Sequence, residues 1–268
     1  MTSLDHLFHY TTLESLALIL KSGKIRFTRL DRVDDVTEAQ SIAGIEFGKY
    51  VLVSCWTQEA EESLPQWHMY GAGMGGVRIQ MPRQIFFEVS YVVPKSYPGL
   101  ELNDLLVSPI SFEQGIASNC LVTPLLFEHE LAGPVEYVED VRAAIAAHLS
   151  SATSGEAVTT ISKTGRVVRY KSKTWSFQNE YRFVLAALPT LAGGLSNAVS
   201  AMRAGTDHGL HHFDASISLQ ALEELVIRTG PLCTPGTVAC IEALLSGWAP
   251  AARLEASALA GTVRRRAQ

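Results

Sequence analysis

The hydrophobic pattern at the start of the chain predicts a strand, a helix and a second strand. Residues 7–10 form an apolar-rich run typical of a short strand, and residues 24–28 alternate between polar and apolar side chains. Four apolar residues between these runs share one helical face: Leu13, Leu16, Ala17 and Leu20. Thr11 and Glu14 have capping-box spacing at the start of this helix, and Gly23 suits the left-handed conformation that ends one.

Further apolar and alternating runs predict the remaining regular elements. Strands are expected at residues 50–56, 77–81, 85–93, 180–185, 225–228 and, as an edge strand, 253–259. A short helix is expected after Ser63, which has capping-box spacing to Gln66, and longer ones at 141–149 and 236–246. The pattern predicts an α+β or mixed α/β domain with a central mixed or split β-sheet flanked by helices.

Three segments show no clear periodicity, and we expect them to be insertions or loops within one domain that spans residues 1–268. Residues 97–133 have poor periodicity, and we expect a mixture of loop and helix there, as in a lid or a partner-facing insertion. Residues 150–160 are rich in Ser, Thr and Gly, which favours a flexible connection, and residues 186–205 are rich in small residues.

Composition narrows the class of protein. A chain of 268 residues with 47% apolar content can bury one substantial core. No apolar run reaches the roughly 18–20 residues of a membrane span, and the N-terminus lacks signal-peptide features, so a cytoplasmic location without membrane contact is expected. The net charge of −5 argues against a surface devoted to nucleic acid. The most basic stretch is interpreted as a solvated helix face rather than a binding patch: Lys163, Arg166, Arg169, Lys171 and Lys173.

Polar and aromatic residues gather at the ends of the predicted strands, where open sheets usually place ligands. They are His9 and Tyr10, Ser54 to Thr57, Trp67 and Tyr70, and Glu180 and Arg182. Each also has a structural interpretation. A lone His9 fits a structural hydrogen bond, the spacing of Glu180 and Arg182 fits an ion pair on one strand face, and that of Trp67 and Tyr70 fits packing of a helix on the sheet.

Several short pieces follow one another along the chain: Phe-His-Tyr-Thr-Thr (8–12), Ile-Leu-Lys-Ser-Gly-Lys-Ile-Arg-Phe (19–27), Arg-Leu-Asp (29–31), Val-Ser-Cys-Trp (53–56), Trp-His-Met-Tyr (67–70), Gly-Val-Arg-Ile (76–79), Lys-Thr-Trp (173–175) and Asn-Glu-Tyr-Arg (179–182). In this order they resemble a bacterial family catalogued as domain of unknown function 2971. The family usually follows its first Asp with Asn-Asp-Pro, whereas this chain has Val-Asp-Asp-Val at 33–36. The resemblance brings no established activity.

A looser resemblance links the chain to ADP-ribosyltransferases, which carry a His or Arg, then a Ser or aromatic residue, then a Glu along the sequence. His9, Ser54 with Tyr70, and Glu180 follow that order. The resemblance implies that His9 holds the nicotinamide ribose of NAD and that Glu180 stabilises the oxocarbenium-like ribose. It further implies that Tyr70 or Trp67 stacks on nicotinamide. The residues expected to contact NAD, including arginines for its pyrophosphate, are Tyr10, Arg26, Arg29, Ser54, Trp56, Trp67, Tyr70 and Arg182.

The resulting expectation is an NAD-dependent ADP-ribosyltransferase-like enzyme that modifies a protein, RNA or DNA. Under this hypothesis the enzyme acts in a bacterial defence or toxin system and has an antitoxin or regulatory partner. The alternative is a non-catalytic nucleotide-sensing or protein-interaction module. A hydrolase ranks last because no carboxylate cluster or Gly-x-Ser-x-Gly motif is present. No metal is expected, although five residues near the end of the chain could suggest one: Asp207, His208, His211, His212 and Asp214.

Overall fold

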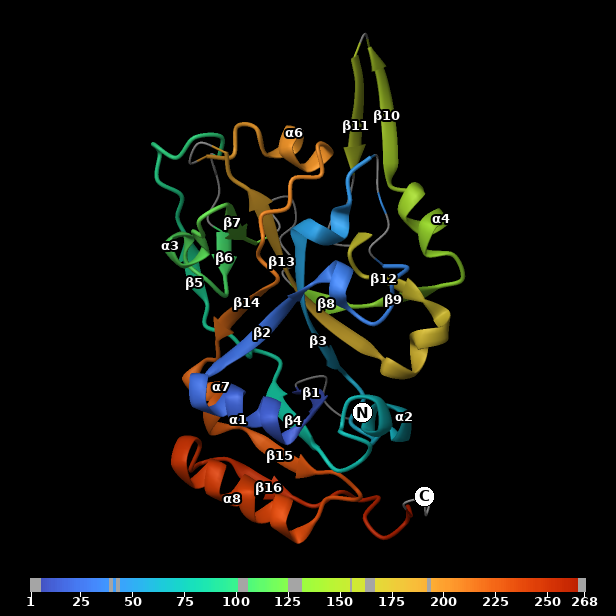
Figure 1. Ribbon diagram of the computed structural model, residues 1–268, viewed down its shortest axis with the longest axis vertical. Coiled ribbons are helices and arrows are strands. Elements are labelled where there is room, and N and C mark those ends of the chain that lie inside the picture. The colour runs from blue at the N-terminus through green and yellow to red at the C-terminus, as the bar shows by residue number, and fades with distance from the viewer. Residues whose placement is uncertain are drawn as a thin grey trace.

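The computed structural model describes residues 6–38, 41, 44–100, 106–124, 132–154, 156–161, 167–191 and 194–264. Ten strands within these ranges join one mixed β-sheet (Figure 1). Seven follow one another in the order β14 (His212–Ser216), β2 (Lys24–Arg29), β3 (Val51–Thr57), β1 (His6–Thr11), β4 (Val77–Pro82), β15 (Val226–Thr229) and β16 (Arg253–Glu255). The long strand β13 (Glu180–Pro189) pairs with β3 and with two short strands, β7 (Cys120–Thr123) and β8 (Ala132–Pro134). This arrangement confirms a mixed α+β domain with a large mixed sheet.

The sheet is split along one edge of β3. The first half of β3 pairs with β2 through Leu52 and Val53, whereas its last residue, Thr57, pairs with Phe8 of β1. Strands β1 and β2 therefore diverge, and residues 54–56 of β3 pair with neither of them. The opposite edge of β3 is paired with β13 along its whole length, in antiparallel register from Thr57 with Glu180 to Val51 with Ala186.

The helices begin and end where local signals place them. Helix α1 (Leu13–Ser22) ends at Gly23, which is left-handed (φ 62°). Its N-cap is Thr12, which accepts a hydrogen bond from the Ser15 amide; the expected capping role of Thr11 is wrong because Thr11 still belongs to strand β1. Helix α2 (Leu64–Met69) is capped by Ser63 as predicted. Helix α8 (Pro235–Trp248) begins at Pro235, directly after its N-cap Thr234, and it packs against α1.

Side-chain alternation along β13 separates two faces of the sheet. Tyr181 and Leu185 belong to the main hydrophobic core, together with residues of α1, β4 and α8. Val184 packs in a smaller apolar cluster on the other face. Glu180 and Arg182 share this second face, since they lie four and two residues before Val184, respectively.

The three segments expected as insertions or loops contain regular structure. Residues 97–133 include β7 and the start of β8. Both strands pair antiparallel with β13 and so extend the main sheet. Residues 150–154 and 156–160 lie in two antiparallel strands, β10 (Leu149–Ser154) and β11 (Glu156–Ile161), and β-branched Thr, Val and Ile favour strands there. Residues 186–205 complete β13 and include α6 (Ala198–Arg203).

Smaller elements complete the described part of the chain. The strand expected at 85–93 is only β5 (Val89–Tyr91), which pairs with β6 (Leu106–Ser108) in a separate sheet. The others are η1 (Leu30–Arg32), η2 (Phe47–Tyr50), α3 (Phe112–Gly115), β9 (Glu136–Val138), α4 (Val141–Ala146), β12 (Tyr170–Ser172), η3 (Lys173–Gln178) and α7 (Leu219–Glu223). None of the helices described is long and apolar enough to cross a membrane.

Candidate functional site

The split between β1 and β2 opens a cavity of about 530 Å³. Its walls come from both diverging strands, from residues 53–57 of β3, and from one face of α1. This volume lies within the range of about 300–1,000 Å³ that is usual for small-molecule sites. Seven of the predicted site residues line it: His9, Tyr10, Arg26, Ser54, Trp56, Tyr70 and Glu180.

Three predicted contact residues do not line the cavity. Arg29 lies at the end of β2, where Asp31 (2.7 Å) and Asp207 (3.0 Å) hold its guanidinium. Trp67 is fully buried and donates its indole N–H to the Glu62 carboxylate (2.9 Å). Arg182 is fully buried, in contact with acidic side chains beneath the cavity. The expectation that these three side chains reach a ligand therefore does not fit their positions.

His9 presents one unengaged ring nitrogen. Its Nδ1 lies 3.0 Å from the carbonyl oxygen of Cys55, so this nitrogen carries the proton and donates it. Burial lowers the pKa of His9 more than this hydrogen bond raises it, which favours the neutral ring. In that form Nε2 is an acceptor, and it has no hydrogen-bond partner among the described residues. His9 can therefore accept a hydrogen bond from a ligand hydroxyl or amide.

Three lining residues have their polar atoms engaged within the protein. The hydroxyl of Tyr10 accepts a hydrogen bond from the Ser63 amide (2.9 Å), and its ring meets Trp67 edge-on. The indole N–H of Trp56 donates to the hydroxyl of Ser54 (3.1 Å). These residues shape the cavity wall.

Tyr70 closes one side of the cavity within a short hydrogen-bond chain. Its hydroxyl donates to the Asp34 carboxylate and accepts from the side-chain amide of Gln178 (2.6 Å). Burial raises the pKa of Tyr70, and the Asp34 carboxylate raises it further, so the hydroxyl stays protonated. Gln178 stands two residues before Glu180 and also lines the cavity. These hydrogen bonds fix the ring of Tyr70 beside the cavity floor.

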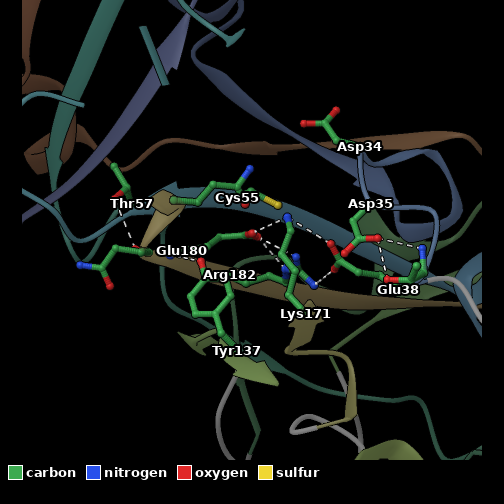
Figure 2. Close-up of polar contacts among 12 residues, drawn as sticks. Asp34, Asp35, Glu38, Cys55, Thr57, Tyr137, Lys171, Glu180 and Arg182 are labelled. Atoms are coloured by element: carbon green, nitrogen blue, oxygen red, sulfur yellow. Dashed lines mark hydrogen bonds and ion pairs between the residues drawn. The ribbon is translucent and has the colours of Figure 1, made fainter. Parts of the chain in front are cut away.

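Two acidic and two basic side chains contact one another at the floor of the cavity: Glu38, Lys171, Glu180 and Arg182. Figure 2 shows their contacts. The ammonium of Lys171 lies 2.9 Å from Glu180 and 3.1 Å from Glu38, and the guanidinium of Arg182 lies 2.7 Å from Glu180 and 2.6 Å from Glu38. None of these side chains is more than 4% exposed. The two cations balance the two carboxylates, so this ion-pair cluster is neutral, which is the arrangement that makes buried charges tolerable.

The cluster keeps Glu180 ionised at the cavity floor. Burial raises the pKa of Glu180, but the charges of Arg182 and Lys171 outweigh burial and lower it to about 2. The thiol of Cys55 lies close by; burial raises its pKa well above the usual range, and Glu180 raises it further. Cys55 is therefore a neutral thiol and a poor nucleophile. Of the four cluster residues, only Glu180 and Lys171 line the cavity.

Glu180 should contribute stability that is lost in acid. The pKa of this carboxyl group is about 4.5 in the unfolded chain and about 2 in the folded protein, so the unfolded chain binds the proton more tightly. The contribution is fully present above about pH 4.5 and is lost as the pH falls toward 2, on the order of 3 kcal/mol in total. Urea unfolding between pH 7 and pH 3 tests this. The wild-type protein should lose more stability over that range than Glu180→Gln, and parallel losses would contradict the assignment.

The sequence interpretation missed several residues of this site. Lys171 was expected on a solvated basic face, which is wrong, because it is buried in strand β12 against Glu38 and Glu180. Glu38 follows Asp31, Asp34 and Asp35 in an acidic stretch of the sequence and carried no signal of its own, and Gln178 carried none beyond its closeness to Glu180. Arg32 also lines the cavity and has no ion-pair partner among the described residues.

Three of the five residues at 207–214 that could suggest a metal serve other contacts. Asp214 binds Arg26 at 2.9 Å, and Asp207 binds Arg29. His208 is hydrogen-bonded to the backbone carbonyl of Lys49 (2.8 Å). In the described ranges, no three His, Cys, Asp or Glu side chains converge in a way that could hold a metal ion.

Comparison with known proteins adds no relative. The chain matches no protein-family model, no curated protein and no solved structure. The two resemblances drawn from the sequence stay predictions. The cavity and its lining residues are the observations that bear on function.

Proposed function

We propose that the cavity binds NAD and that the protein is an ADP-ribosyltransferase-like enzyme that modifies a protein or nucleic acid. One observation carries this proposal: His9 of β1, Tyr70 at the end of α2 and Glu180 of β13 come from distant parts of the chain and line a single cavity. The split of the sheet between β1 and β2 supports an ADP-ribosyltransferase-like arrangement, since all three residues line the cavity at that split.

The chemistry follows from the positions of these side chains. When the bond between ribose C1′ and nicotinamide breaks, nicotinamide leaves with the electron pair and the ribose becomes oxocarbenium-like. Ionised Glu180 accepts a hydrogen bond from a ribose hydroxyl and stabilises the positive charge. An acceptor nucleophile then bonds to C1′ and loses its proton. His9 Nε2 accepts from a second hydroxyl, and the Tyr70 ring stacks on nicotinamide. Arg32 on the wall is the partner for pyrophosphate, whereas Arg26 keeps its bidentate ion pair with Asp214.

A second candidate function follows from the two cations that neutralise the charge of Glu180. Both carboxylate oxygens already bind a cation: Oε1 binds Arg182 and Oε2 binds Lys171. Oε1 contacts both Nε (2.8 Å) and Nη2 (2.7 Å) of Arg182, so Oε2 is the oxygen that keeps a lone pair for a ligand hydroxyl, and the neighbouring cations weaken the stabilisation of positive charge. This observation favours a nucleotide-sensing or protein-interaction module that binds in the same cavity without turnover.

The deciding experiment measures binding and turnover together. Purified protein is titrated with NAD by calorimetry and then incubated with NAD and a cell lysate. Nicotinamide release and ADP-ribose incorporation into protein and nucleic-acid fractions are followed by mass spectrometry, with Glu180→Gln as the matched variant. Incorporation that depends on Glu180 supports the transferase, and binding of intact NAD supports the sensing module. Absence of NAD binding would contradict the transferase and a sensing module for NAD.

A further inference from the structure

A second cavity, of about 420 Å³, lies on the other face of β13 from Glu180. Successive side chains of a strand point to opposite faces, so Tyr181 and Phe183 line this cavity whereas Glu180 faces the first one. The other walls come from Phe27 of β2, from Arg83 and Phe86 after β4, and from Val107 of β6. No residue of this cavity takes part in the site proposed for NAD.

The wall of the second cavity is an aromatic cluster. Phe86 meets Phe27 at 5.3 Å between ring centroids and Phe183 at 5.0 Å, and Phe183 meets Tyr181 at 5.5 Å. Edge-on and tilted contacts of this kind hold the rings in place. Two further apolar residues of the lining are exposed to solvent: Phe87 has an exposed fraction of 42% and Val107 one of 43%. The cavity therefore offers a rigid apolar surface to a hydrocarbon body.

One uncompensated cation lies on this apolar wall. The guanidinium of Arg83 lies over the Tyr181 ring, 4.6 Å from its centroid, and donates to the Tyr181 hydroxyl from Nε (3.0 Å) and Nη2 (2.9 Å). It forms no ion pair with any described carboxylate. The acidic side chain on the wall, Glu88, is instead hydrogen-bonded to Gln84 (2.6 Å). Three of the five guanidinium N–H groups of Arg83 therefore remain for a ligand.

We propose that this second cavity binds a small amphipathic carboxylate. The hydrocarbon body packs on Phe86, Phe87 and Phe183, and the carboxylate binds the free N–H groups of Arg83. A single guanidinium and an apolar wall match one negative charge at the end of an apolar body, since a charge-assisted bidentate contact satisfies the cation. This ligand class is independent of the function proposed for the first cavity.

Calorimetry with decanoate and with decanol, each below its aggregation concentration, tests the proposal on the full chain. Wild-type protein should bind one decanoate saturably and more tightly than decanol. Arg83→Gln should weaken decanoate binding at least tenfold and leave decanol unchanged. Arg32→Gln, which removes the same charge from the first cavity, is the matched control and should bind decanoate as the wild type does.

A second variant guards against a local folding defect at Arg83. Phe87→Glu places a negative charge at the exposed mouth of the cavity and should also weaken decanoate binding, because the two carboxylates repel. Absence of saturable decanoate binding, equal affinity for decanol, or the same loss in Arg32→Gln would each overturn the proposal.

Discussion

Replacing Glu180 with Gln is expected to slow NAD-dependent nicotinamide release about 10²–10³-fold, which is the usual cost of removing one group that stabilises charge in a transition state. Gln keeps the size of the side chain and a hydrogen bond to a ribose hydroxyl. It lacks the negative charge that the developing oxocarbenium ion requires. Single-turnover release of nicotinamide, measured at saturating NAD, separates this effect from weaker binding.

Glu38→Gln is the matched control for this variant. Glu38 contacts the same two cations as Glu180, and its replacement changes the net charge of the ion-pair cluster by the same amount. Glu38 does not line the cavity. If Glu180 acts on the substrate, Glu38→Gln should retain most of the nicotinamide release at equal folded fraction. Equal losses in the two variants would mean that the cluster supports the fold and that Glu180 has no chemical role.

The parts of the fold that the sequence predicts are those with local causes. Gly23 ends α1 because a left-handed residue is needed there, and Ser63 caps α2 through its own hydroxyl. Strand β7 has no such local signal. Its four residues join the main sheet only because the far end of β13 offers unpaired backbone groups. Pairing of this kind depends on distant residues, and no periodicity in 97–133 indicates it.

The candidate site divides in the same way. His9, Tyr70 and Glu180 stand out because each is polar or aromatic at the end of a regular element, and the structure brings them to one cavity. Lys171 and Glu38 do not stand out. Each sits in a stretch of like charge, which is typical of solvated surface, and their burial results from a contact between distant segments. A buried ion pair is visible only once both partners are placed in space.

Lys171→Met is expected to lower the free energy of unfolding by about 3–5 kcal/mol, because removing one partner of a buried ion-pair network leaves a charge uncompensated. Methionine retains a long apolar side chain, so little cavity is created. Glu38 and Glu180 would then share Arg182 alone, and the buried cluster would carry a net negative charge. Urea unfolding at pH 7 measures the loss.

Lys173→Met, two residues along the chain, is the internal control for this measurement. Lys173 is 64% exposed and pairs with Glu139, which is 80% exposed, so solvent screens the pair and its removal should have no measurable effect. Adding Glu38→Gln to Lys171→Met restores neutrality and should recover part of the lost stability, because the two residues are directly coupled. A double variant whose loss equals the sum of the single losses would show that charge balance does not hold the cluster together. The stability of β13 beneath the cavity would then rest on packing alone.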